Sequence, residues 1–401
     1  MTPKGPLAGI RVLDLSRILA GPFATQLLAD LGATVIKVEH PRVPDDTRAW
    51  GPPFTRGVSA YFAAVNRGKR SLACDLKSPA GRSILERLVL QSDVVFENFL
   101  PGVAARLKVS AADLKAINPN AIVISITGFG SKAATAERPG FDFLIQAMSG
   151  LMSITGDPGG EPTKAGVALV DVITGLYAAV AALSALYART SAGGTSQVQH
   201  CDISLMGAAM AAMVNVVQTH LTTGVDAQRY GNAHPTIVPY QTFPTRDGRL
   251  AIAVGTDAQF QRLMTALGQA TIGREARFAT NPQRVAHREE LVAIITLATV
   301  AQTTGEWERQ LVAAKVPCGP VNSVAEALAF WEKAQPDALV RDPSGQRYIG
   351  SPLWMNGHGP VAPTHSPPQL GADTVAVLDE LGFSKAEVAA WFKQGAITFP
   401  D

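Results

Sequence analysis

The stretch IRVLDLSRILAGPFATQLLADLGATVIKV, residues 10–38, decides the fold. Its two ends, Ile10–Leu15 and Val35–Val38, are short apolar runs typical of buried strands. Between them, Gly21-Pro22 opens a segment in which apolar residues recur every four positions, and Gly32 closes it, as expected of an amphipathic helix. Two strands joined by a helix predict a parallel pair with a right-handed crossover.

The same alternation continues on the C-terminal side of this unit. Further strands are predicted at 71–75, 94–96 and 121–126. The helices between them open at Ser78-Pro79, where proline takes a first-turn position, and at Ser110, which forms an approximate capping box with Asp113. Ligands of parallel sheets bind beyond the carboxyl ends of the strands. For the first two strands, residues 16–21 and 39–50 make this edge.

One carboxylate, Asp171, stands between the apolar run Val167–Val170 and seventeen residues that carry no charge. A buried charge is costly unless it has partners, so this aspartate needs an explanation. The residues alone leave two open: an N-cap that accepts backbone N–H groups, or a nucleophile or base that the helix dipole keeps ionised. The helix that follows is expected to end at Gly193-Gly194. Its expected apolar face comprises Val172, Leu176, Val180, Leu183 and Tyr187.

A different pattern begins near residue 225. Ile237–Phe243 and Leu250–Val254 flank the turn residues Arg246–Arg249, which is a hairpin signal. Amphipathic helices are expected at 257–267, 284–300 and 305–315. Val316–Pro320 has the composition of a rigid turn.

These patterns predict an α/β protein with two domains. Residues 1–215 form the first part of a large Rossmann-like domain with a parallel sheet. Residues 225–335 form a small α+β domain. Residues 336–401 contain a return linker and C-terminal helices that complete the large domain.

Composition argues against several classes of protein. The 401 residues are 47% apolar and 17% charged, and the formal net charge of +2 without a long basic run argues against a nucleic-acid binder. Cys74, Cys201 and Cys318 form no CxxC pair and suit a reducing cytoplasm. The N-terminal residues lack the pattern of a signal peptide. The stretch Val172–Ala188 resembles a membrane span in length, but its alanine content favours a buried core helix.

Motifs for common cofactors are missing. SRILAGP follows the first strand, and Ala133 takes the third glycine position after Gly128-Phe-Gly130, so the dinucleotide fingerprint fails. No Walker motif, HExxH or GxSxG occurs, and the seven histidines show no metal-ligand spacing. Cationic and polar residues at the strand ends together suit a multiply phosphorylated ligand. They are Arg17, His40, Arg48, Arg70, Lys77, Asn98, Arg106 and Arg138.

Longer motifs carry a resemblance to a known family. They are LAGIRVLDLSRILAGPFATQLLADLGATVIKVEHP, DDTRAWGPPF, NRGKRSLACDLKSPAG, DVVFENFLPG, ITGFG, RPGFDFLIQAMSGLM, DVITGLY, HPTIVPYQTF, VPCGPV and PPQLG, in this order along nearly the whole chain. The chain resembles the class III CoA-transferases, or CaiB/BaiF family, which includes formyl-CoA transferase and alpha-methylacyl-CoA racemase. The resemblance implies a Rossmann-like large domain, a small domain joined by two linkers, and a homodimer of interlocked chains. It implies acyl-CoA and a small carboxylate as substrates, with coenzyme A as the transferred group and no metal or dinucleotide.

The resemblance also assigns residues to roles. Asp171 matches the family's nucleophile, which would form mixed anhydrides and an aspartyl-CoA thioester. Residues expected at CoA are Arg17, Ile18, Ala20, His40, Cys74, Lys77, Asn98, Phe99, Arg106 and Arg138. His40 stands where the formyl-transferase pattern has an arginine. Residues expected at the acyl group or the acceptor are Leu19, Arg48, Phe141, Asp142, Arg229 and His234.

Two features distinguish activities within the family. The racemase pattern has Gly-His-Asp, with histidine as a base, whereas this chain has Gly140-Phe141-Asp142; phenylalanine cannot move a proton, so transfer is favoured. The runs DDTRAWGPPF and NAHPTIVPYQTF look most like those of succinyl-CoA:dicarboxylate transferases such as the glutarate enzyme. A second carboxylate on the acceptor needs a cation, for which Arg48, Arg229 and His234 are the candidates. The alternatives are a 2-methylacyl-CoA racemase or epimerase and a non-catalytic CoA-binding protein.

Overall fold

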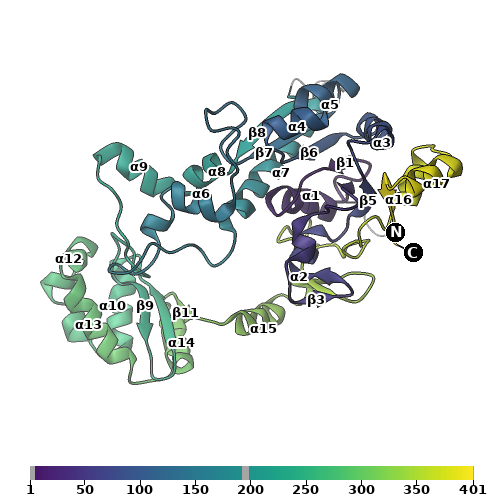
Figure 1. Cartoon of the computed structure of the whole chain (residues 1–401). Helices are drawn as coiled ribbons and strands as arrows, with labels where there is room; N and C mark the ends of the chain where they lie inside the picture. The colour runs from purple at the N-terminus through teal and green to yellow at the C-terminus, as the bar shows by residue number, and fades with distance from the viewer. Residues whose placement is uncertain (1–4, 192–197, 401) are drawn as a thin grey trace. The chain divides into compact units, whose positions relative to one another are not determined.

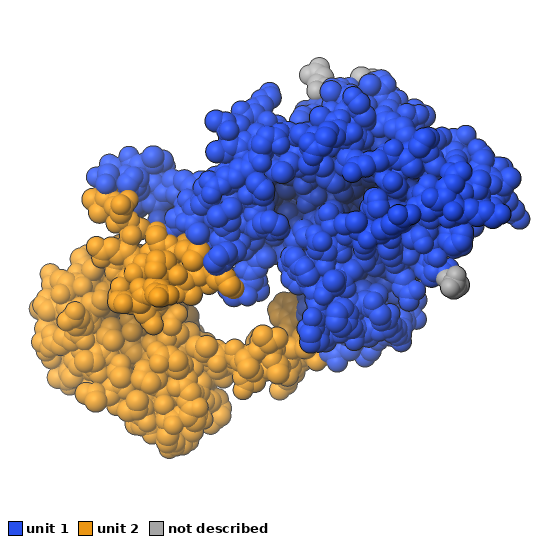
Figure 2. Space-filling model, in the orientation of Figure 1, with its two compact units in different colours: residues 1–151, 165–224, 335–401 blue, residues 152–164, 225–334 orange. Residues whose placement is uncertain are grey.

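The computed structural model describes residues 5–191 and 198–400. The chain forms two compact units, which Figure 2 colours separately. Unit 1 comprises residues 1–151, 165–224 and 335–401, and unit 2 comprises 152–164 and 225–334. Residues 152–164 thus group with unit 2, whereas the prediction from sequence kept them in the large domain.

Unit 1 is built around a seven-stranded sheet with the order β14-β5-β2-β1-β6-β7-β8. The strands are β1 Arg11–Asp14, β2 Thr34–Glu39, β5 Arg70–Cys74, β6 Val94–Glu97, β7 Ile122–Thr127, β8 His200–Ser204 and β14 Ile397–Thr398. All pairs are parallel except the one between β14 and β5 at the edge. The predicted, mostly parallel α/β sheet is confirmed, and the first five predicted strands end within one residue of the observed ones.

The strand order reverses at β1. Strands β2 and β5 follow on one side of it, and β6, β7 and β8 on the other. In open parallel sheets, such a switch point creates a crevice outside the carboxyl ends of the strands. Here the loops after β1 and β6 are joined across it, because the Arg17 amide donates to Asn98 Oδ1 at 3.0 Å and Asn98 Nδ2 donates to the Arg17 carbonyl at 2.8 Å.

Helices cover both faces of this sheet (Figure 1). One face packs on α1 Ala20–Asp30, α7 Leu169–Ser191 and α8 Leu205–Ala212; the other packs on α3 Pro79–Leu90, α5 Ala111–Ile117 and α16 Thr374–Glu380. Successive strand residues alternate between the two cores, as Val94 and Val95 do. The predicted Ser78 cap of α3 and the Ser110–Asp113 capping box of α5 are both confirmed.

Shorter elements connect these layers. They are η1 Asp46–Ala49, β3 Phe54–Thr55, β4 Val58–Ser59, α2 Ala60–Asn66, α4 Pro101–Leu107, α6 Asp142–Met148, α9 Val214–Thr223, η4 Pro336–Ala338, β12 Leu339–Arg341, β13 Arg347–Ile349 and α17 Lys385–Lys393.

The buried face of helix α7 differs from the predicted one. Its small residues, among them Gly175 and Ala178, pack inward, and a Cβ on Gly175 would lie 2.7 Å from the Ala20 carbonyl oxygen of α1. Of the apolar face predicted to be buried, Leu176, Val180 and Tyr187 are exposed instead. Close approach of two helices demands small side chains at the contact, so the alanines rather than the large residues face α1. The predicted stop at Gly193-Gly194 lies outside the described residues.

Among the described residues, α7 is also the one helix long and apolar enough to cross a membrane, and half of that stretch is buried. A core helix meets the same criteria of length and composition.

Unit 2 has its own core around a three-stranded antiparallel sheet, in the order β11-β10-β9. Its elements are η2 Met152–Ile154, β9 Tyr240–Pro244, β10 Arg249–Ala253, α10 Asp257–Ala266, α11 Ala270–Gly273, η3 Ala276–Phe278, α12 Asn281–Ala286, α13 Arg288–Thr299, α14 Thr304–Ala313, β11 Cys318–Pro320 and α15 Val324–Ala334. The predicted hairpin is confirmed as β9–β10. The turn predicted at Val316–Pro320 was wrong, because Cys318–Pro320 pairs with β10 as an edge strand, a position that tolerates proline.

Candidate active site

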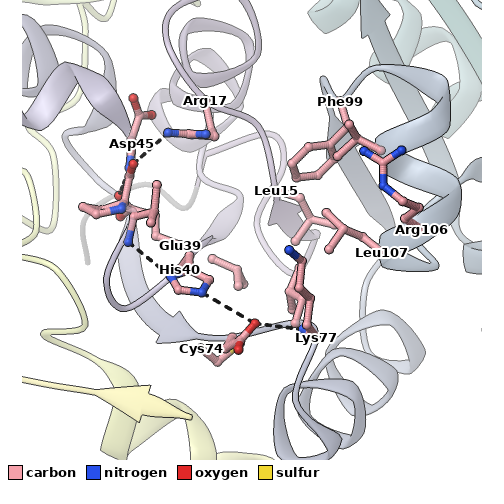
Figure 3. A pocket seen from close by; sticks show the side chains of 16 residues that line it. Leu15, Arg17, Glu39, His40, Asp45, Cys74, Lys77, Phe99, Arg106 and Leu107 are labelled. Carbon is pink, nitrogen blue, oxygen red and sulfur yellow. Dashed lines mark hydrogen bonds and ion pairs between the residues drawn. The ribbon is translucent and has the colours of Figure 1, made fainter. Parts of the chain in front are cut away.

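A first cavity of about 360 Å³ opens at the carboxyl ends of β1, β2, β5 and β6 (Figure 3). Arg17, His40, Cys74, Lys77, Phe99 and Arg106 line it, all of which were predicted to contact CoA. Apolar walls come from residues such as Leu15, Val38 and Leu107. A cavity that combines apolar walls with several cations suits a ligand that carries phosphates on an organic body.

Two cations of this cavity are available to a ligand. In the part of the chain that the structure describes, neither the Lys77 ammonium nor the Arg106 guanidinium has a hydrogen-bond or ion-pair partner. The His40 ring is engaged, since Nδ1 accepts from the Arg42 and Val43 amides and Nε2 lies 3.6 Å from Asp75 Oδ1. Lys77 and Arg106 are therefore the cations most free to bind an anion.

Cys74 forms part of the wall of the first cavity. Burial raises the pKa of its thiol to about 12, so the thiol stays protonated at neutral pH. A protonated thiol is a poor nucleophile, and Cys74 contributes shape rather than reactivity.

A second cavity of about 330 Å³ adjoins the first and contains Asp171. The two share Arg17, Phe99 and Val103 as lining residues. The second is also lined by Ile18, Leu19, Ala20, Asn98 and Phe141, five more of the predicted site residues. The sheet topology thus gathers two adjoining cavities along a single edge, one with several cations and one with the suspected nucleophile.

Asp171 is a buried carboxylate without a stabilising partner. It is 8% exposed, and no described residue donates a hydrogen bond to its carboxylate. Burial, and secondarily the charge of Asp142, raises the pKa of Asp171 to about 7. The dipole at the start of α7 acts in the opposite direction, because it favours the ionised form of Asp171. A carboxyl group poised near neutral pH in a cavity is typical of functional sites.

Asp142, predicted to contact substrate, instead caps the helix that carries Asp171. Its Oδ1 accepts from the Val170 amide at 2.8 Å and from the Asp171 amide at 3.3 Å, and its Oδ2 accepts from Gln146 Nε2 at 2.6 Å. The N-cap interpretation of Asp171 was therefore wrong: α7 begins at Leu169, which leaves Asp171 in the first turn with its side chain unused.

The N-terminus of α1 faces the second cavity with open donors. Leu19 and Ala20 line this cavity, no side chain caps the helix, and their amide N–H groups have no acceptor among the described residues. Free N–H groups at a helix start attract negative charge. One cavity thus holds a nucleophile candidate and donors for an oxyanion.

Besides Asp142, four predicted site residues are absent from the described linings of the two cavities. Arg138 is absent from the described lining residues, and its guanidinium stands 5.4 Å from the Phe129 ring. Arg48 is bound by both carboxylate oxygens of Glu39 and by the Pro368 carbonyl.

The other two belong to unit 2, whereas unit 1 alone lines the cavities. The Arg229 guanidinium donates hydrogen bonds to the backbone carbonyls of Ser153, Asp157 and Gly160. His234 packs against Tyr240, and its Nδ1 accepts from the Thr236 amide.

Lys37 and Asp45 were not among the residues predicted from sequence, yet they form a fully buried ion pair of 3.0 Å beneath the loop after β1. The available signal was a lysine in the middle of the apolar strand TVIKVE. Tyr61 was not predicted from sequence either; its pKa is raised by burial and by the charge of Asp171. Within the described residues, no group of three or more His, Cys, Asp or Glu side chains could hold a metal ion.

Replacing Asp171 with asparagine is expected to stabilise the fold at pH 8. The pKa of Asp171 rises from 3.8 to about 7 on folding. At pH values between these two, the folded state holds a proton that the unfolded state has lost, so the free energy of unfolding falls as pH rises through this window. Asparagine carries no charge, so Asp171→Asn should raise the free energy of unfolding by about 2–4 kcal/mol at pH 8 and by less at pH 5. Urea unfolding at both pH values measures this, with the exposed Asp379→Asn as the control. An equal or lower stability of Asp171→Asn at pH 8 would contradict it.

Comparisons with known proteins identify the family. The model of "CoA-transferase family III" matches residues 7–374. A succinate–glutarate CoA-transferase of Agrobacterium fabrum is 42% identical over 94% of this chain and 96% of its own length. A succinyl-CoA:glutarate CoA-transferase of Homo sapiens is 36% identical over 94% of this chain and 86% of its own. The crystal structure of a CAIB/BAIF family protein from Brucella suis superposes with a TM-score of 0.85 at 42% identity, and covers 94% of this chain and 100% of that one. With its parallel sheet and two adjoining cavities, the chain belongs to CoA-transferase family III.

Proposed function

We propose that this CoA-transferase moves CoA from succinyl-CoA to glutarate or a similar dicarboxylate, with Asp171 as a covalent nucleophile. Relatives named for glutarate transfer support the substrates. One observation carries the proposal for the mechanism: the buried, unpartnered Asp171 carboxylate shares a cavity with open backbone N–H groups, and that cavity adjoins a cationic one.

The first half of the reaction would remove CoA from the donor. The Asp171 carboxylate attacks the thioester carbonyl, so that a C–O bond forms, the C–S bond breaks and CoA leaves as a thiolate. The product is a mixed anhydride between Asp171 and the donor acid. The thiolate then attacks the aspartyl carbonyl of this anhydride, which forms an aspartyl-CoA thioester and releases the donor carboxylate.

The second half repeats these steps in reverse order. The acceptor carboxylate attacks the aspartyl-CoA thioester, which releases CoA thiolate and forms a second anhydride. The thiolate attacks the acceptor carbonyl, which yields the new acyl-CoA and regenerates Asp171. The energy of the thioester passes through each acyl intermediate, so the balance needs no ATP.

Each attack places negative charge on a carbonyl oxygen next to Asp171. The N–H groups of Leu19 and Ala20 at the start of α1 are positioned to donate to this oxyanion, because they line the same cavity and have no acceptor among the described residues. The helix dipole adds to the stabilisation of the oxyanion.

The acyl chain would lie against the apolar part of the second cavity. Ile18, Leu19, Ile126 and Leu205 give this cavity walls that suit methylene groups. Phe141 also lines it and offers no base for the α-proton, in line with transfer rather than racemisation. Among the described lining residues of this cavity, Arg17 is the cation that could meet a second carboxylate, although its guanidinium also pairs with Asp46.

A panel of acceptors tests the proposed substrates. With succinyl-CoA as donor, glutarate and other dicarboxylates should give at least about tenfold higher kcat/KM than acetate or propionate, because one charge-assisted hydrogen bond to a second carboxylate is worth about 1.5–3 kcal/mol. Chromatography of the acyl-CoA products measures each rate. Equal use of acetate and glutarate would refute the dicarboxylate assignment, and no transfer to any carboxylate would refute the function.

We also propose that the active form is a homodimer of interlocked chains, as the family resemblance implies. Helix α7 exposes large apolar side chains, including Val180 and Tyr187, and neither α9 nor α15 buries a single residue in the chain alone. Exposed apolar surfaces of this kind mark interaction sites, and a second copy of the chain could cover several of these helices in one interface.

Val180→Asp should shift the protein from dimer to monomer, because a charge would replace an apolar contact at the interface. Light scattering coupled to gel filtration measures the mass. Val312→Asp on α14 is the matched control, since Val312 is 58% exposed and Val180 57%. A dimer of unchanged stability in Val180→Asp, or a monomeric parent protein, would contradict the proposal.

A further inference from the structure

Ile18 has a backbone conformation that its side chain disfavours. Its φ of 72° lies in the left-handed region, where a β-branched residue is rare and costs about 1–2 kcal/mol or more. Ile18 lines the second cavity together with the next two residues, Leu19 and Ala20, whose N–H groups have no acceptor among the described residues. Strain of this kind persists only where surrounding groups impose it, and it concentrates at functional sites.

Asp45 imposes this conformation. The Ile18 amide lies 3.2 Å from both carboxylate oxygens of Asp45. Asp45 is itself 1% exposed and is fixed by Thr47, whose amide and hydroxyl donate to Oδ1 at 3.1 and 2.7 Å. The Ile18 N–H therefore has a firmly held acceptor, whereas the N–H groups of Leu19 and Ala20 have none among the described residues.

Lys37 supplies the charge that keeps Asp45 in place. Its ammonium, fully buried in the middle of β2, lies 3.0 Å from Asp45 Oδ2 and donates to the Ser16 carbonyl at 2.7 Å. The Lys37 ammonium therefore links Asp45 to Ser16 at the beginning of the loop. Asp45 in turn accepts from the Ile18 amide in the same loop. The neighbouring charges raise the pKa of Lys37 and lower that of Asp45 against the effect of burial, so both are charged at neutral pH.

The rest of the loop is held equally firmly. The Ser16 amide donates to Asp14 Oδ1 at 3.0 Å, and Asp14 forms a buried ion pair of 3.0 Å with Lys69. The Arg17 backbone exchanges its two hydrogen bonds with Asn98. The amide N–H groups of residues 16–18 thus all have acceptors. The Leu19 N–H is the first in this loop without an acceptor among the described residues.

We propose that Asp45 is a positioning residue for transfer, with Lys37 as its counter-ion. By holding Ile18 in the left-handed conformation, it turns the following peptide so that the Leu19 and Ala20 N–H groups point to where the carbonyl attacked by Asp171 becomes an oxyanion. This inference rests on the proposed function of Asp171 and of these donors. It assigns a role to a buried ion pair whose Asp45 also forms part of the wall of the first cavity.

The proposal predicts that glycine at position 18 compensates for the loss of Asp45. Without Asp45, Ile18 relaxes to negative φ and the donors turn away, so Asp45→Ala should lower kcat at least about tenfold. The KM for acyl-CoA should change less than kcat, because Asp45→Ala alters one wall of the first cavity but leaves its cations Lys77 and Arg106 in place. Glycine adopts positive φ without the steric cost, so Ile18→Gly/Asp45→Ala should recover kcat to within a few-fold of Ile18→Gly alone.

Steady-state kinetics of the parent protein, both single variants and the double variant test this. If Asp45→Ala fails to fold because Lys37 is left unpaired, the pair replacement Lys37→Met/Asp45→Ala, with and without Ile18→Gly, gives the same comparison. Asp30→Ala serves as control, since it removes another buried ion pair, with Arg67, and should lower thermal stability without lowering kcat.

Unchanged kcat in Asp45→Ala, or a double variant no faster than Asp45→Ala, would overturn the proposal. A parent protein without transfer activity would refute the function instead, which keeps the two failures distinct.

Discussion

Asp171→Ala is expected to lower the rate of CoA transfer by at least about 10³-fold while the fold survives. The proposed reaction passes through bonds to the Asp171 carboxylate. Among the described residues that line the second cavity, Asp46 is the only other carboxylate, and it pairs with Arg17. Removing a covalent nucleophile leaves only binding and oxyanion stabilisation, which account for a small part of the rate.

Asp171→Asn separates chemistry from packing. Asparagine has the shape of aspartate but cannot form the anhydride, so it should be as inactive as alanine and more stable than the parent protein at pH 8. Transfer from succinyl-CoA to labelled glutarate measures both variants, and circular dichroism checks the fold. Folded Asp171→Ala with normal turnover would exclude Asp171 as the nucleophile.

Lys77→Ala and Arg106→Ala are each expected to raise the KM for acyl-CoA by about tenfold to a hundredfold. Both cations line the first cavity and lack partners among the described residues, so each can form charge-assisted hydrogen bonds to a phosphate. The kcat at saturating acyl-CoA and the KM for the acceptor should change little, because Asp171 lies in the other cavity.

Initial rates at varied acyl-CoA and acceptor concentrations separate these effects. Lys115→Ala on α5, outside both cavities, is the control for a general change in charge. The effects of Lys77→Ala and Arg106→Ala should shrink as salt rises. A raised KM for the acceptor with an unchanged KM for acyl-CoA would show that these cations bind the carboxylate substrate instead.

Local patterns were sufficient for much of unit 1. Strands such as Val94–Glu97 are short apolar runs between turn residues, and Ser78-Pro79 marks the start of a helix through its own side chain and ring. The determinants of these elements lie within a few residues, so the sequence predicts them. The edge of the sheet where ligands bind could be predicted as well, since parallel strands place their carboxyl ends together.

Contacts between distant residues escaped the same reasoning. Asp142 caps α7 from 28 residues away, so Asp171 looked like the cap when read locally. The large residues of α7 have a helical period, which identifies a face but not what packs on it; α1 approaches too closely for anything but small side chains. A lysine inside β2 was visible in the sequence, but its partner Asp45 was not, because the pairing depends on a loop's path through space.

Trapping with hydroxylamine tests the covalent role of Asp171 most directly. The protein is incubated with succinyl-CoA, treated with hydroxylamine, which converts an aspartyl anhydride or thioester to a hydroxamate, and mapped by peptide mass spectrometry. If Asp171 carries the acyl intermediates, hydroxamate appears on Asp171 only when both reagents are present, and never on the neighbouring Asp142. Full transfer activity with no hydroxamate on Asp171, or with the label on another carboxylate, would contradict it.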